Sequence, residues 1–107
     1  MTKVVVDPGI CGLQTTVEVD KVSKRKVKVI IASDCEIVTQ LGNSLTEVDQ
    51  WEAIKQYGDC QVLKAASKCH MHVTCPVPVA VLKAIEVEAG LALPRDVLVQ
   101  FKKDVEP

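Results

Sequence analysis

Three of the five cysteines in this chain of 107 residues stand where a thiol can do chemistry. Cys11 lies in a loop, whereas Cys35 and Cys75 each stand at the start of a predicted helix. Free backbone N–H groups and the helix dipole stabilise an anion at such a start, so a thiolate forms more readily there. Thiolates bind zinc and iron–sulfur clusters, and they attack sulfur. The cysteines therefore indicate metal binding or sulfur chemistry.

His72 and Asp34 are the candidates for a fourth ligand. His72 precedes Cys75 by three residues, a spacing that brings both side chains to one ion if the chain turns there. Asp34 stands beside Cys35, although its simplest role is to cap the predicted helix. An ordinary surface or core role is also open for His72. The candidate metal ligands are Cys11, Cys35, Cys75, His72 and Asp34.

The other two cysteines give weaker signals. Cys60 lies in a predicted loop. If residues 69–75 are extended, Cys69 and Cys75 lie about 20 Å apart, too far to share an ion. Free cysteine is among the residue types that are most often buried. Simple packing in the core is therefore the alternative role for every thiol in the chain.

A predicted antiparallel hairpin must bring Cys11 and Cys35 together. Residues 13–20 and 25–32 alternate apolar and polar side chains, and the link between them is short. With the turn centred near residues 22–23, position 11 lies opposite residues 34–35. We therefore expect these two cysteines to be spatial neighbours.

Two helices and one further strand are expected around this hairpin. Residues 3–6 predict a short strand, and the Ser33-Asp34 pair begins a helix. Ser44 and Glu47 form a capping box, which predicts a second helix through Tyr57.

The last third of the chain predicts a mixture of elements. Residues 62–67 indicate a short helix or turn, and residues 69–75 an extended stretch. Pro76 opens a helix that Gly90 ends. The alternation over residues 97–101 predicts a final strand, and the charged tail 103–107 is expected to fray.

These elements predict one α+β domain over residues 1–107. Its antiparallel sheet of three or four strands carries helices, built from residues 33–57 and 76–90, on one face. Aliphatic side chains are expected to supply much of the core: Val17, Val19, Val27, Val29, Ile37, Val38, Leu41, Val81, Leu82 and Ile85.

Composition and charge exclude several function classes. The net charge is -1 and aromatic residues make up 3% of the chain, so neither a basic nucleic-acid surface nor a base-stacking platform is expected. No apolar run approaches the roughly 20 residues that span a bilayer, and no signal peptide is recognised. We therefore expect a cytoplasmic protein, where an odd number of cysteines argues against a disulfide framework.

The Cys11-Gly12, Cys35 and Cys75 pattern resembles the iron–sulfur cluster assembly scaffolds of the IscU/NifU N-terminal type. That family has a Cys-Gly loop before a strand and hairpin, a second Cys at a helix start, and a third Cys before a late amphipathic helix. The similarity covers residues 11–90. It implies an IscU-like α+β fold, an iron–sulfur cluster or zinc on the three cysteines, and a sulfur donor protein or a cluster acceptor as partner.

The chain departs from that family's pattern at three points. Leu13 stands where the family has Asp after Cys-Gly, and Thr74 stands where it has His before the third Cys. The Leu-Pro-Pro-Val-Lys stretch that the family's partner chaperone reads is absent from the sequence. Delivery through that chaperone is therefore not implied.

The sequence leaves three functions open. The first is binding of a metal ion or an iron–sulfur cluster by the candidate ligands. The second is a sulfur carrier or sulfurtransferase, in which Cys35 or Cys75 holds a persulfide. The third is a non-catalytic interaction module with buried cysteines. No phosphate-binding loop, paired helical histidines or nucleophile elbow is present, so hydrolase or kinase chemistry is not expected.

Overall fold

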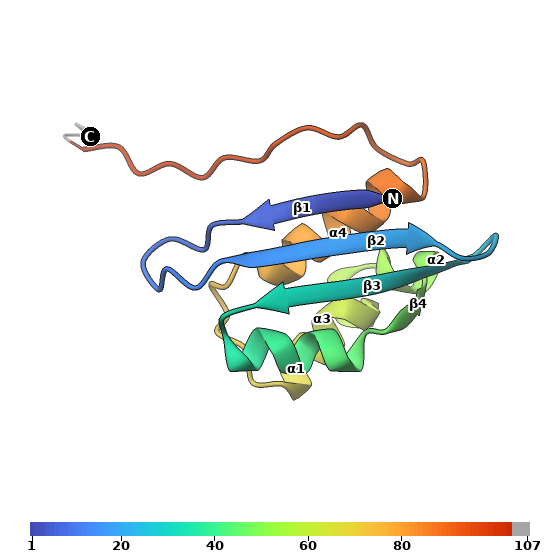
Figure 1. Cartoon of the computed structure of the whole chain (residues 1–107), viewed down its shortest axis with the longest axis horizontal. Coiled ribbons are helices and arrows are strands. Elements are labelled where there is room, and N and C mark those ends of the chain that lie inside the picture. Colours follow the sequence, from blue (N-terminus) through green and yellow to red (C-terminus); the bar gives the residue numbers. More distant parts are fainter. Residues whose placement is uncertain (104–107) are drawn as a thin grey trace.

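Four antiparallel strands pair in chain order, and helices lie against one face of the sheet (Figure 1). This computed structural model describes residues 1–103. It has the predicted α+β architecture. The strands are β1 (Thr2–Val6), β2 (Thr15–Lys21), β3 (Lys26–Ser33) and β4 (Glu47–Asp49). The helices are α1 (Glu36–Ser44), α2 (Gln50–Ala53), α3 (Gln61–Lys68) and α4 (Val77–Glu88), with a 3₁₀ turn, η1 (Tyr57–Asp59).

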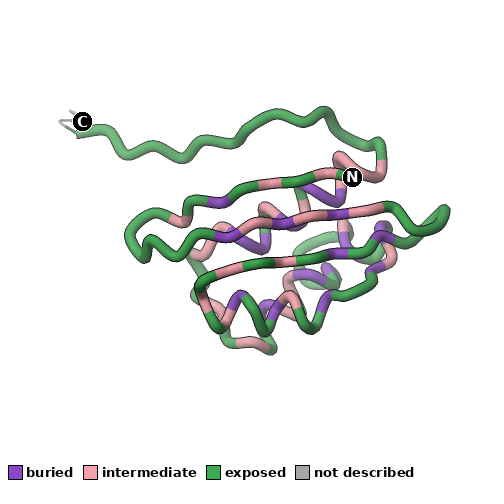
Figure 2. Tube along the Cα trace, in the orientation of Figure 1, coloured by how far each residue is buried: buried purple, intermediate pink, exposed green. Residues whose placement is uncertain are grey.

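The β2–β3 hairpin forms the centre of the core. Thr15 pairs with Ser33 at one end of the hairpin, and Lys21 pairs with Val27 at the other. Because strand side chains alternate between faces, this register sends one row of side chains toward the helices. The buried valines of that row, purple in Figure 2, are Val17, Val19, Val27 and Val29.

Most of the expected core residues are buried, and two are not. Leu82 is half-buried and packs against the core from α4. Ile37 is half-buried as well and lines a pocket. The sequence pattern identified the inward faces of β2, β3, α1 and α4 but not how fully their edges are covered.

The prediction of one helix from Ser44 to Tyr57 is wrong in extent, since only residues 50–53, α2, form an α-helix between them. Residues 47–49 form β4 instead, and Val48 pairs with Val27 of β3 and is only 1% exposed. Burial of this valine in the sheet stabilises a strand where the local sequence favours a helix.

The capping box is not formed either. The Ser44 hydroxyl donates a hydrogen bond back to the Gln40 carbonyl at 3.1 Å. Asp49 caps α2 instead, because its side chain accepts from the N–H groups of Trp51 and Glu52.

Residues 69–75 turn rather than extend, so the 20 Å separation expected for an extended stretch does not apply. His70 has a φ of 58°, the left-handed conformation that commonly ends a helix. Its N–H donates to the Ser67 carbonyl at 3.1 Å, and that of Met71 donates to Ala66 at 3.2 Å. The α4 helix that follows is confirmed, and Gly90 with a φ of 77° ends it.

The final strand predicted over residues 97–101 is also wrong. These residues are exposed and belong to no strand, and the chain from 91 to 103 runs alongside β1 without joining the sheet (Figure 1). Of the tail 103–107 that was expected to fray, residues 104–107 lie outside the described part. No helix among residues 1–103 is long and apolar enough to cross a membrane.

Glu88 ties the end of α4 to the first two strands. Its carboxylate accepts from the Thr2 hydroxyl at 2.8 Å and from the Lys21 N–H at 3.0 Å, and it lies 3.5 Å from the N-terminal ammonium of Met1. Desolvation raises the pKa of Glu88, but these hydrogen bonds and the ammonium together lower it below its ordinary value of 4.5.

We expect Glu88→Gln to lower the free energy of unfolding by about 1.5 kcal/mol near neutral pH, because hydrogen bonds to a charged acceptor are lost. A carboxylate whose folded-state pKa is lowered stabilises the fold above its unfolded pKa. The difference between wild type and variant should therefore shrink as the pH falls below 4.5. Urea unfolding of both proteins at a series of pH values measures this difference in the free energy of unfolding.

Glu86→Gln is the matched control on the same helix, because no hydrogen bond or ion pair of the Glu86 side chain is seen within residues 1–103. It should change stability by less than about 0.5 kcal/mol. Equal losses for the two variants would contradict the role given to Glu88.

Candidate functional site

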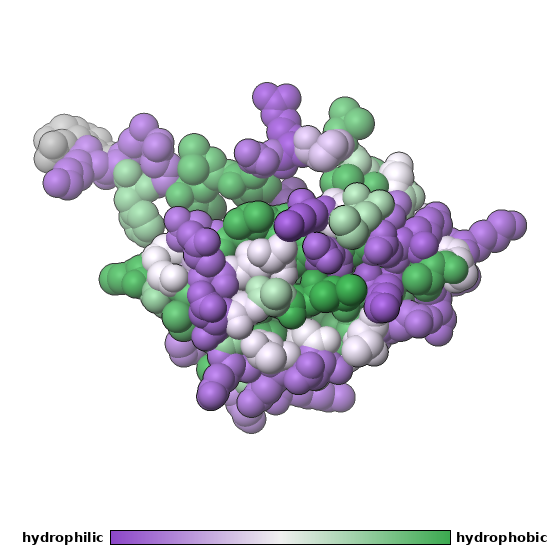
Figure 3. Space-filling view, viewed as in Figure 1, coloured by the Kyte–Doolittle hydropathy of each residue, from purple (hydrophilic) through white to green (hydrophobic). Residues whose placement is uncertain are grey.

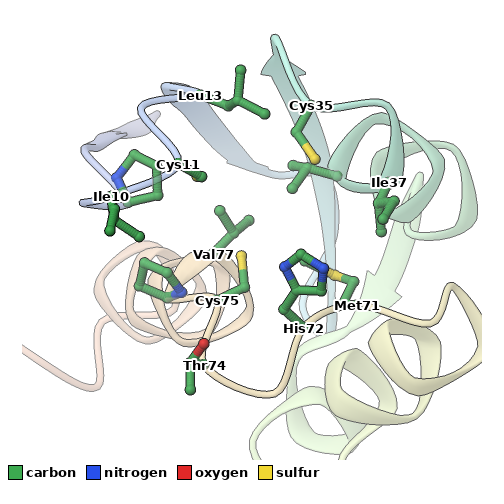
Figure 4. A pocket seen from close by; sticks show the side chains of 13 residues that line it. Ile10, Cys11, Leu13, Cys35, Ile37, Met71, His72, Thr74, Cys75 and Val77 are labelled. Carbon is green, nitrogen blue, oxygen red and sulfur yellow. The ribbon is translucent and has the colours of Figure 1, made fainter.

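One pocket gathers four of the five predicted ligands. It has a volume of about 150 Å³ and receives Cys11, Cys35, Cys75 and His72 from three separate segments (Figure 4). It lies where β1 ends, β2 and α1 begin, and the chain enters α4. The remaining lining residues are largely apolar: Pro8, Ile10, Leu13, Ile37, Val38, Met71, Thr74, Pro76 and Val77.

Cys11 sits in a tight turn between β1 and β2. The Gly12 N–H donates to the Gly9 carbonyl at 3.0 Å, so Ile10 and Cys11 occupy the middle of the turn. Both glycines have positive φ, 93° and 68°, which residues with a Cβ rarely adopt. The Asp7 carboxylate accepts from the Gly9 N–H at 3.1 Å and so stabilises the turn. Cys11 is thereby presented on an exposed loop.

Cys35 is held by both of its backbone groups. Its N–H donates to the Ser33 hydroxyl at 3.1 Å, and its carbonyl accepts from the Thr39 hydroxyl at 3.0 Å. Ser33 in turn shares a 2.7 Å hydrogen bond with the hydroxyl of Thr15, a buried residue on the paired strand. Cys35 is the N-cap of α1, and no side chain caps that helix. The half-buried thiol is therefore positioned by the sheet itself.

Cys75 and His72 share one turn. The Cys75 N–H donates to the His72 carbonyl at 3.0 Å, which is the turn that the His72 spacing required. Cys75 is half-buried and directly precedes Pro76, the N-cap of α4, whereas His72 is exposed. In Figure 4 the sulfurs of Cys35 and Cys75 both point into the pocket, and the His72 ring lies beside Cys75.

The register of the hairpin differs from the expected one by about two residues. Thr15 opposes Ser33, and the Asp34 N–H donates to the Gln14 carbonyl at 3.4 Å. Leu13, rather than Cys11, is therefore the position that continues the register opposite Cys35. Cys11 still reaches the same pocket, because the turn at residues 9–12 folds it back.

Asp34 and the other two cysteines lie elsewhere. Asp34 is exposed and is not among the residues that line the pocket. Cys60 is buried as the N-cap of α3, where its thiol donates to the Ala53 carbonyl at 2.9 Å. Cys69 ends the same helix, with its sulfur 4.0 Å from the Ser44 hydroxyl.

The donors share a pocket without forming a preassembled ligand set. Within residues 1–103, no group of three or more His, Cys, Asp or Glu side chains is arranged to hold a metal ion. Met71 adds a thioether to the pocket wall, a soft donor that sequence reasoning missed. The Thr15–Ser33 hydroxyl pair was missed too, although its residues face each other in the hairpin register and could have been found from it.

The pocket surrounds its thiols with uncharged groups. None of its lining residues is Asp, Glu, Lys or Arg. Two thiolates in such a setting need a cation, because an unpaired charge is costly away from water. A bound metal ion supplies that charge and replaces the thiol protons. The arrangement therefore suits soft-metal ligation or the chemistry of a single ionised thiol.

A protein-family model described as a family of unknown function (DUF6951) matches residues 2–101 of the chain. No curated protein and no solved structure matches the chain.

We expect Ser33→Ala to lower the free energy of unfolding by about 1–2 kcal/mol, because it leaves the buried Thr15 hydroxyl and the Cys35 N–H without their partner. It should also speed alkylation of Cys35, since the start of α1 is then less firmly held. Urea unfolding and mass spectrometry of the alkylated peptides measure the two effects.

Ser44→Ala is the control, since the Ser44 hydroxyl is exposed, donates to the Gln40 carbonyl of its own helix and otherwise has only the 4.0 Å contact with the Cys69 sulfur. It should leave stability within about 0.5 kcal/mol of wild type and the Cys35 alkylation rate unchanged. The positioning role of Ser33 fails if both variants behave alike.

Proposed function

We propose that this chain, which belongs to the DUF6951 family of unknown function, binds a zinc ion or an iron–sulfur cluster in the cysteine pocket. The observation that carries the proposal is that Cys11, Cys35, Cys75 and His72 line one pocket, although they come from three segments far apart in sequence. Three sulfurs and one imidazole form a ligand set that both centres accept.

The half-buried thiols of Cys35 and Cys75 are the donors that the fold holds in place. Cys35 is held by Ser33 and Thr39, and Cys75 by the turn that precedes α4. Cys11 lies on an exposed turn that contacts solvent, so its sulfur is the one that adjusts when the ion arrives. Because two thiols are held in place and the third can move, the donors would converge on one point only when an ion binds.

His72 is a better fourth ligand than Asp34. The His72 ring lines the pocket, whereas the Asp34 carboxylate is exposed outside it. The apolar wall would then shield the half-buried Cys35 and Cys75 side of the centre from water. A cluster on this pocket would take its sulfur from a donor protein and pass the cluster to an acceptor.

Metal and sulfide content of protein purified without oxygen tests the function directly. We expect one centre per chain: brown protein with iron and labile sulfide indicates a cluster, and colourless protein with zinc indicates a single ion. Protein that contains neither, and that takes up neither zinc nor iron and sulfide on reconstitution, contradicts the proposal.

Ligand variants locate the centre. Cys35→Ala and Cys75→Ala should each abolish binding, whereas His72→Ala should weaken it by about tenfold. Asp34→Ala should leave it unchanged. Cys69→Ala is the matched control, since Cys69 is equally half-buried but lies outside the pocket. Undiminished stoichiometry and affinity in Cys35→Ala would show that a core cysteine was mistaken for a ligand.

The same variants separate ligation from packing. A bound ion stabilises the folded state, so Cys35→Ala should remove the metal-dependent rise in Tm. A merely packed cysteine costs stability to the same extent with and without metal. Thermal unfolding in zinc and in chelator distinguishes these cases.

A sulfur carrier is the second candidate, favoured by the position of Cys35 as an N-cap whose helix has no side-chain cap. Its thiolate would attack the outer sulfur of a donor persulfide. A new S–S bond then forms on Cys35, the donor's S–S bond breaks, and the donor leaves as a thiolate. This function predicts a metal-free protein that gains one sulfur atom on Cys35, which mass spectrometry detects.

A further inference from the structure

The segment 97–101 is an extended, apolar arm that pairs with no strand among residues 1–103. It alternates Val97, Val99 and Phe101 with Leu98 and Gln100, and aromatic and β-branched residues of this kind favour strands. Val99 is 84% exposed and Phe101 is 97% exposed. In Figure 3 hydrophobic groups stand out in green along the arm. An exposed apolar segment of this kind is typical of a surface that binds another protein chain.

The sheet offers an open edge of matching length. β1 pairs with β2 on one side only and lies at the end of the strand order. It has five residues, as many as the arm. The N–H and C=O groups on its free side form a template on which another strand can pair.

The side-chain pattern of the arm also matches that of β1. Val4 and Val6 face the core, whereas Lys3 and Val5 are exposed on the open face of the sheet. A fifth strand that places Val97, Val99 and Phe101 on the core side would extend the buried row of the sheet. Its other side chains, Leu98 and Gln100, would then join the open face.

The route of the arm favours a second molecule over its own β1. The end of α4 is fastened to the start of β1 through Glu88 and Thr2. From there the arm runs along the sheet but stands off it, and every residue from 90 to 103 is exposed (Figures 1 and 2). Each molecule therefore presents an unpaired extended segment, residues 97–101, and an unpaired edge of its sheet, at β1.

We propose that residues 97–101 of one molecule add as a fifth strand to the β1 edge of a second copy, in a reciprocal dimer. Exchange in both directions satisfies both edges and closes with two-fold symmetry, so the assembly stops at two. The family match ends at residue 101, so the arm falls within the matched part of the chain. The proposal does not depend on the cysteine pocket.

Light scattering and sedimentation equilibrium of the 107-residue chain test the dimer. We expect wild type to dimerise and Val99→Asp to raise the dimer Kd by about tenfold or more, because a carboxylate would be buried without a partner. Gln100→Asp adds the same charge on the open-face side and should change the Kd by less than about threefold. Both residues are exposed in the single chain, so neither variant should impair folding.

Hydrogen exchange identifies the contact. Amides of residues 97–101 and of β1 should be protected together in the dimer and lose protection together on dilution or in Val99→Asp. A chain that stays monomeric overturns the proposal, including one whose arm is protected by its own β1. Dimerisation that Val99→Asp leaves unchanged overturns it as well, since the interface must then lie elsewhere.

Discussion

The pairing of Thr15 with Ser33 is the constraint on which the rest of the structure depends. This register decides which side chains of β2 and β3 face the helices, and a shift of one residue would send the buried valines to solvent. The same pair joins two hydroxyls, and Ser33 then holds the N–H of Cys35. One register thus sets both the core and the position of a thiol.

Helices cover only one face of this sheet, and the uncovered parts are where interactions with other molecules can occur. At the end where β1, β3 and the start of α4 meet, the helices leave a pocket of about 150 Å³ with three thiols on its wall. Along the side, β1 keeps an open edge. None of the pocket's lining residues is Asp, Glu, Lys or Arg, whereas the free edge of β1 presents backbone N–H and C=O groups on which a strand can pair.

Local patterns were sufficient for much of the fold and for the grouping of the site. The valine run at residues 3–6 predicted β1, alternation predicted the hairpin, and proline and glycine marked the two ends of α4. Because a hairpin joins the ends of its two strands, loop and helix-start cysteines were expected to meet, and Cys11 and Cys35 do line one pocket. The His72–Cys75 spacing likewise corresponds to a turn within four residues. The strands and turns depend on neighbours along the chain, so sequence alone determined them, whereas the register that places Leu13 opposite Cys35 did not follow from it.

Tertiary contacts decided the features that local patterns misjudged. Val48 lies in a strand against its helical signals, because pairing with Val27 buries it in a core that residues distant in sequence complete. Residues 97–101 have a strand pattern but no strand, since a strand needs a partner and the pattern cannot supply one. Asp34 is exposed and stands outside the pocket although it adjoins Cys35 in sequence. Sequence determines local preference, whereas packing across the chain determines which preferences are satisfied.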